Sequence, residues 1–408
     1  MSGQHKITKA RIVEAIISRE EMRDKYFKEC VPIIGKYATF ELEQLYSIYD
    51  ERLYLWLATL WDPTIGGFYF SFSGRDCDAF LPDIESTAQA MIFLNKSGLM
   101  SKFGSDFKTA VPPPMREALL RFTKGLQDPD DGFFYHPQWG KNVANTRRAR
   151  DLSWATDLIS KLGDTPNYPS PLDKGKDGEK SEHLPPHLRD IDEWRKYLGE
   201  FNLSKRSAVV GSTISAQAIQ IAAAGDEYVD EVLSWLEERQ NPENGLWEDD
   251  ITYASVDGMV KMIILYNHFD KPMKNADKAL KSALIAALSN EPIVCCTQFY
   301  NPVRAISGIL ENLHIIGAND DAEALGRTVA AHSEELVRAP RETTAHFPMI
   351  LIPTPAFHKE HLLGWDLRKG ISTPRLCVRR ELPQACVERL ESRESPFSAK
   401  RIRRYSLI

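Results

Sequence analysis

Four acidic side chains are placed where paired carboxylates could carry out acid–base chemistry. Each is expected in or just after the first turn of a helix that is apolar on most faces: Asp83, Glu85, Asp151 and Asp257. Glycoside hydrolysis requires two carboxylates, one on either side of the scissile bond. An Asp at a helix start is most often a cap, and Glu85 could be the reciprocal member of one. Asp257 needs a partner inside its apolar segment, and Lys261 is a natural one, either as a structural ion pair or within a site.

Cations and aromatic rings accompany these acids. Arg147, Arg150 and Arg304 lie near the expected helix starts. Guanidinium groups bind carboxylates, and flat aromatic rings suit the faces of sugars. We therefore predict an anionic ligand, either an acidic saccharide or a phosphorylated small molecule. The residues predicted to bind it are Arg75, Asp76, Tyr135, His136, Arg148, Trp154, Gln217 and Lys261.

A loop pattern that occurs three times indicates that the chain is built from similar units. The pattern is Trp or Gln, Asp or Asn, Pro, two residues, Gly, any residue and an aromatic. Its copies occupy residues 61–68, 127–134 and 240–247. Internal similarity of this kind is typical of stacked supersecondary units. The aromatic residues Phe68, Phe134 and Trp247 are expected to wedge neighbouring hairpins together.

The spacing of apolar residues predicts about twelve helices and no strand of any length. Amphipathic helices alternate with nearly all-apolar ones, which include 211–224, 253–268 and 300–316. The simplest arrangement is six antiparallel hairpins closed into a ring with the apolar helices inside. The inner helices then begin at one mouth, where their partial positive charges favour an anionic group. These helix starts are expected near Asp83, Asp151, Gly211, Ser255 and Pro302.

With these loops and helices the chain resembles the α/α-toroid proteins, which include six-hairpin glycosidase-like enzymes and the terpenoid cyclases with the protein prenyltransferases. The loops look like the QW-type repeats of the cyclases, and residues 82–88, PDIESTA, are similar to the opening of an inner helix there. The resemblance covers roughly residues 8–337 and implies an all-α, (α/α)6 toroid. Tyr135 and His136 beside Arg148 are similar to the proton-transfer groups of toroid polysaccharide lyases.

The leading interpretation is a glycoside hydrolase or polysaccharide lyase acting on a short acidic saccharide. The alternatives are a terpenoid cyclase-like or prenyltransferase-like enzyme and a non-catalytic scaffold or binding protein. A class II cyclase is expected to have Asp-x-Asp-Asp, whereas residues 83–86 read Asp-Ile-Glu-Ser and lack the third carboxylate. A prenyltransferase needs zinc ligands, and the loop residues 76–78, Asp-Cys-Asp, are a poor metal site. We therefore expect no metal and no cofactor.

Length and composition define the domain organisation. The 408 residues, with a net charge of −6, are enough for one toroid domain at 1–338, with 164–186 as a polar insertion or lid. Residues 339–408 are rich in Pro and Arg and are expected to be irregular. The mild charge predicts no nucleic-acid partner. The polar N-terminus and the lack of an apolar run of about 18 residues predict a cytoplasmic protein without a membrane span.

Overall fold

The computed structural model describes residues 9–338, apart from 48, 50, 99, 101–105, 175–179 and 294–295, and also residues 365–366 and 371–372. This part of the chain is mostly helical, which confirms the all-α prediction. Its strands are two short antiparallel pairs. The first joins β1 (Trp61–Asp62) to β2 (Gly67–Phe68), and the second joins β3 (Trp365–Asp366) to β4 (Ile371–Ser372).

The N-terminal helix α1 (Lys9–Tyr46) is long and bent. Its backbone leaves helical geometry at Gly35, where φ is +82°, three residues after Pro32. Helix α2 (Glu51–Ala58) follows and leads into the first repeated loop. The later helices, in chain order, are α3 (Phe72–Arg75), α4 (Ile84–Lys96), α5 (Phe107–Ala110), α6 (Pro113–Gly125), α7 (Asn145–Lys161), η2 (Pro186–Leu188), α8 (Ile191–Gly199), α9 (Leu203–Ser215), α10 (Ala218–Ala224), α11 (Asp226–Arg239), α12 (Tyr253–His268), α13 (Ala276–Ala287), α14 (Cys296–Ile315) and α15 (Asn319–Ala331).

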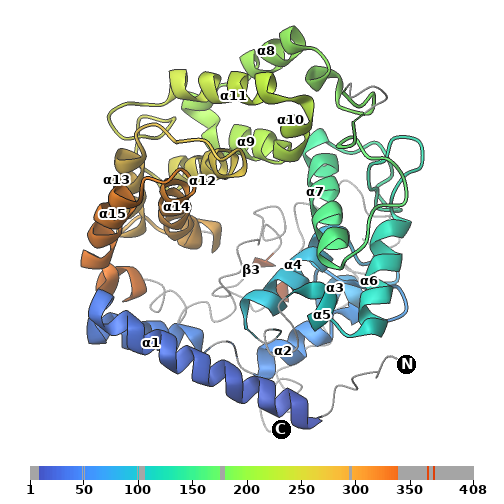
Figure 1. Ribbon diagram of the computed structural model, residues 1–408, viewed down its shortest axis with the longest axis horizontal. Coiled ribbons are helices and arrows are strands. Elements are labelled where there is room, and N and C mark those ends of the chain that lie inside the picture. Colours follow the sequence, from blue (N-terminus) through green and yellow to red (C-terminus); the bar gives the residue numbers. More distant parts are fainter. Residues whose placement is uncertain are drawn as a thin grey trace.

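The helices follow one another around the molecule in chain order (Figure 1). One row consists of α4, α7, α9, α12 and α14, and each of these helices packs against the next. Helix α6 packs on α7, α13 packs on α12 and α14, and α15 packs on α14, so that a second set of helices covers the row. Helix α15 returns to α1, and just beyond it the Ser333 hydroxyl donates to the Ile34 carbonyl at 3.2 Å.

The three repeated loops share one backbone geometry. In each loop the amide of the Gly donates to the carbonyl of the Asp or Asn four residues before it, at 2.8 to 3.0 Å. The side chain of that same Asp or Asn accepts from the amide two residues after it. The Gly has a positive φ in all three copies: Gly66, Gly132 and Gly245. The sequence repeat is therefore also a structural repeat.

Each of these glycines also lies directly against the backbone of a later element. A Cβ at Gly66 would collide with Ala118 of α6, and one at Gly245 would collide with Ala279 of α13. A Cβ at Gly132 would collide with Pro169, so the 164–186 segment packs on the second loop. Only glycine permits both the positive φ and the close approach.

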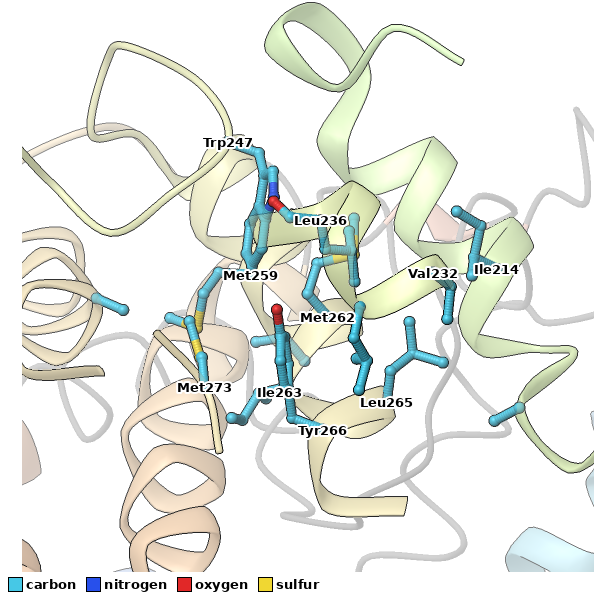
Figure 2. Packing of buried hydrophobic residues seen from close by; sticks show 14 of the residues in the cluster. Ile214, Val232, Leu236, Trp247, Met259, Met262, Ile263, Leu265, Tyr266 and Met273 are labelled. Carbon is cyan, nitrogen blue, oxygen red and sulfur yellow. The ribbon is translucent and has the colours of Figure 1, made fainter. Parts of the chain in front are cut away.

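The aromatic residue of each loop is buried, as expected of a wedge between helices. Phe68, Phe134 and Trp247 are at most 2% exposed. The indole nitrogen of Trp247 donates to the carbonyl of Leu236 at 2.8 Å, at the edge of the apolar core formed by α9 and α11–α13 (Figure 2). This hydrogen bond satisfies the polar atom of a ring that is otherwise surrounded by apolar side chains.

Three expected helix starts are wrong. Gly211 lies in the middle of α9, Pro302 lies inside α14, and Asp151 lies in the second turn of α7 rather than the first. The single helix expected over 211–224 is instead the end of α9 followed by α10, with an angle of 62° between the two helices. Within the described residues no single helix is long and apolar enough to cross a membrane, although the bent pair α9 and α10 would qualify by length and composition.

A capping box begins α12 and supports a stability prediction. The Thr252 hydroxyl accepts from the Ser255 amide at 3.2 Å, and the Ser255 hydroxyl accepts from the Thr252 amide at 2.9 Å. We expect Thr252→Ala to lower the free energy of unfolding by about 1 kcal/mol, because one amide of the first turn loses its acceptor. Urea titration measures this loss. Thr64→Ala, in the first repeated loop, is the control and should change stability little; equal losses would contradict the assignment.

Candidate active site

Two predicted acids lie at the start of α4, and they differ in their contacts. Asp83 is the N-cap of the helix, and its carboxylate accepts from the amide and the hydroxyl of Ser86 at 2.8 and 2.6 Å. Glu85 is fully buried, and Gln89, one turn later, donates to it at 3.2 Å. Asp83 therefore has the cap role that is usual at this position, whereas Glu85 is not part of a capping box.

Helix α7 brings two guanidinium groups to Glu85. Arg147 Nη1 donates to Glu85 Oε2 at 2.6 Å, and Arg150 Nη2 donates to Glu85 Oε1 at 2.6 Å. Arg147 also holds Asp151 one turn later, through Nη2 and through Nε, the latter at 3.1 Å. One guanidinium thus joins two carboxylates. We call Asp83, Glu85, Arg147, Arg150 and Asp151 the α4–α7 cluster.

Burial controls the protonation of the α4–α7 cluster. Asp151 is 4% exposed, and its burial, together with the negative charges of Glu85 and Asp83, raises its pKa to about 6 against the opposing effect of Arg147. Burial alone would lower the pKa of Arg147, but Glu85 and Asp151 raise it above its usual value. Asp151 can therefore exchange a proton close to neutral pH while Arg147 remains charged.

His136 is buried against the chain that enters α4. Its Nε2 is 3.2 Å from the Pro82 carbonyl, and its Nδ1 accepts from the Gln138 amide at 3.3 Å, so we assign a neutral imidazole with the proton on Nε2. Burial lowers the pKa of His136, which agrees with this neutral form. Its ring stacks on Trp139 at 4.4 Å, and Arg147 lies 5.4 Å from the Trp139 ring. His136 thus positions both the start of α4 and one side of the cluster.

A small hollow borders Glu85 between α2, the first repeated loop and α4. Its volume is about 50 Å³, and Glu85, Ser86 and Gln89 supply polar groups to its lining. Its aromatic walls are Trp56, Phe68, Tyr69, Phe70 and Phe93. An engineered cavity that binds benzene measures about 150 Å³, so this hollow admits the edge of a ring or a small substituent.

The other predicted binding residues have identifiable contacts. Tyr135 donates to Asp131 at 2.9 Å, and Arg148 donates to Asn145 at 2.6 Å. Gln217 is fully buried, and its side-chain oxygen is 2.7 Å from His187 Nε2. Trp154 of α7 packs on the apolar cluster around Phe134. Arg75 and Asp76 form an ion pair with each other at 2.7 Å near the surface.

The fourth predicted acid lies on other elements. Asp257 of α12 pairs with Lys261 at 3.8 Å, as its spacing predicted, and accepts from Asn301 of α14 at 2.5 Å. Helices α12 and α14 lie across the centre of the molecule from α4 in Figure 1. The structure therefore brings Asp83, Glu85 and Asp151 together and places Asp257 in a second polar group.

No family model, curated protein or solved structure matches this chain. The chemistry of the α4–α7 cluster therefore follows from its own residues. Among the described residues, no group of three or more His, Cys, Asp or Glu side chains could hold a metal ion. Sequence reasoning noted Arg147 and Arg150 only as nearby cations, although the spacing of Arg147 and Asp151 signals an ion pair on one helix face.

Proposed function

We propose that the α4–α7 cluster is the acid–base centre of a hydrolase or lyase that acts on a short acidic saccharide. The observation that carries this proposal is the bridge formed by Arg147, which holds Glu85 and Asp151 side by side. With Asp151 protonated, the two guanidinium groups balance Asp83 and Glu85. This charge balance favours Asp151 as the group that donates a proton and Glu85 as the carboxylate that remains ionised.

The aromatic hollow next to Glu85 supports a saccharide rather than an isoprenoid substrate. A polyprenyl chain needs a long apolar cavity, and about 50 Å³ holds only a few atoms. A sugar can instead lie across the exposed part of an aromatic wall, with Phe70 37% exposed at this position. Arg148, which follows Arg147 on α7 and donates to Asn145 at 2.6 Å, is the cation that we assign to the acidic group of the substrate.

The same proposal includes the architecture that would hold this centre. An (α/α)6 toroid at residues 1–338 is supported by the row of five helices, by the helices that cover it and by the contact of α15 with α1. The first hairpin would be α1 and α2. Apart from the four strand residues, the predicted irregular tail at 339–408 lies outside the described residues. A cytoplasmic location remains part of the proposal.

Activity on a panel of uronate-containing oligosaccharides tests the function. Released reducing ends measure hydrolysis, and absorbance of unsaturated uronates measures elimination. We expect Asp151→Asn to lower kcat/KM by about 10²–10⁴-fold, the usual contribution of a general acid or base. Asp157→Asn is the matched control, because Asp157 is an exposed residue of the same helix that pairs with Lys161. No turnover of any substrate by the wild-type protein would refute the function, and full activity of Asp151→Asn would refute the site.

The pH dependence of that activity follows from Asp151. Its pKa is raised to about 6, so the carboxyl is protonated below that pH and ionised above it. If Asp151 is the proton donor, kcat/KM should decrease about tenfold per pH unit above pH 6. A pH–rate profile measures this limb. The limb should be absent from the residual activity of Asp151→Asn and unchanged in Asp157→Asn, and its persistence in Asp151→Asn would assign the proton to another group.

A further inference from the structure

The hollow beside Glu85 is small enough to limit what can enter it. Its volume is about 50 Å³, and it lies between α2, the first repeated loop and one face of α4. The residues of that face follow helical spacing: Glu85, Ser86, Gln89, Ala90 and Phe93. An engineered cavity of about 150 Å³ holds benzene with its six carbons, so this hollow holds two or three non-hydrogen atoms.

The charges at the hollow disfavour an ionised substituent. The carboxylate of Glu85 lines the hollow, whereas the guanidinium groups of Arg147 and Arg150 are not part of the lining. An anion would therefore meet a like charge. A cation would meet a carboxylate that already accepts from Arg147 and Arg150 at 2.6 Å each, and it would lose its own hydration. A neutral substituent avoids both costs.

The walls of the hollow combine apolar surface with one hydrogen-bond donor. Trp56, Phe68 and Phe93 supply apolar surface. The side-chain nitrogen of Gln89 donates to Glu85 at 3.2 Å, and its second hydrogen has no acceptor among the described residues. The hydroxyl of Ser86 already donates to Asp83 at 2.6 Å. A ligand carbonyl oxygen can therefore accept from Gln89 while a methyl group lies against the aromatic walls.

We propose that this hollow is a subsite for an acetyl substituent of the saccharide, and that Gln89 recognises the acetyl carbonyl oxygen. The inference rests on the proposed function, because it concerns a substituent of the same substrate. An acetyl group is neutral, has three non-hydrogen atoms and carries one acceptor beside its methyl group. A free hydroxyl would leave the aromatic walls without an apolar contact, and a longer acyl chain would exceed the volume.

Binding without turnover tests the subsite on the full-length protein. Isothermal titration and saturation-transfer NMR would use N-acetylglucosamine and 6-O-acetylglucose, with glucose and N-butanoylglucosamine as controls. We expect at least one acetylated sugar to bind about tenfold or more tightly than both controls, through burial of the methyl group and one hydrogen bond. The acetyl methyl protons should receive the strongest saturation. Comparison of the two acetylated sugars distinguishes an amide from an ester.

Three variants assign this binding to the hollow. Gln89→Leu should weaken the binding of the acetylated sugar by about fivefold, because the carbonyl loses its donor. Phe70→Ala should also weaken it, and it decides the matter if Gln89→Leu does not fold, because the Phe70 ring is 37% exposed at the edge of the hollow. Asn95→Leu is the matched control, since Asn95 is an exposed residue of α4, and it should bind as the wild type does.

The outcomes separate the subsite from the enzyme activity. Absence of binding of both acetylated sugars, equal affinity for glucose, or unchanged affinity in Gln89→Leu and Phe70→Ala would overturn the subsite. Turnover of uronate-containing oligosaccharides without any preference for acetylated sugars would refute the subsite and keep the proposed function. Selective binding of an acetylated sugar without turnover of any oligosaccharide would keep the subsite and refute the function.

Discussion

Replacing Glu85 with alanine is expected to lower the free energy of unfolding by about 3–5 kcal/mol, the cost of breaking a buried ion pair by removing one partner. Glu85 is fully buried and accepts hydrogen bonds from Arg147 and Arg150 at 2.6 Å each. Its removal takes away the carboxylate that both guanidinium groups share at the contact of α4 with α7. Chemical denaturation followed by circular dichroism measures this loss.

The control for Glu85→Ala is a substitution that removes a solvent-exposed ion pair. Glu323→Ala removes a carboxylate that pairs with Arg327 on the exposed face of α15, and it should change stability little. The loss of unfolding free energy in Glu85→Gln should lie between those of Glu85→Ala and Glu323→Ala, because the amide keeps the volume and part of the hydrogen bonding. Equal stability of Glu85→Ala and Glu323→Ala would show that the α4–α7 cluster does not join its helices.

Substituting Gly245 with alanine is the second change expected to have a large effect. Gly245 has a φ of +71°, and an added Cβ would lie 2.8 Å from the Asn275 carbonyl oxygen and collide with the Ala279 backbone. The left-handed backbone costs about 1–2 kcal/mol for an L-residue. Separation of the third loop from α13 would add about 1–3 kcal/mol, in the range of overpacking. Thermal unfolding measures the sum of the two effects.

Gly317→Ala distinguishes the two costs. Gly317 follows α14 with a φ of +78°, and nothing lies within 4 Å of the position its Cβ would take. It should therefore show only the conformational part of the loss. If Gly245→Ala were no more destabilising than Gly317→Ala, the third loop would not pack directly against α13. The close contact that we give as the reason for the repeated glycine would then be wrong.

The sequence predicted the features that depend on interactions between residues close together in the chain. The repeated Gly and aromatic positions could be identified because a left-handed turn needs glycine and a wedge needs a large apolar ring. The cap at Asp83 and the Asp257–Lys261 pair also follow from spacing along one helix. For these features the sequence neighbours and the spatial neighbours are the same residues.

Features that depend on distant contacts could not be read in this way. Glu85 and Arg147 are 62 residues apart, and nothing in either segment identifies the other as its partner. The break between α9 and α10 falls at Ala216 and Gln217, with no proline or glycine to signal it. It lies beside Gln217, whose buried side chain contacts His187 of η2. Packing against other elements therefore decided both features.

The contact of α15 with α1 affects how local unfolding passes from one helix to its neighbours. Helices that touch mainly their successors form a chain of dependent units, in which a defect loosens the adjoining units first and distant ones last. Because α15 contacts α1, loosening of either helix requires the separation of these two packed surfaces. The hydrogen bond from Ser333 to Ile34 lies at this contact and would be lost in that separation.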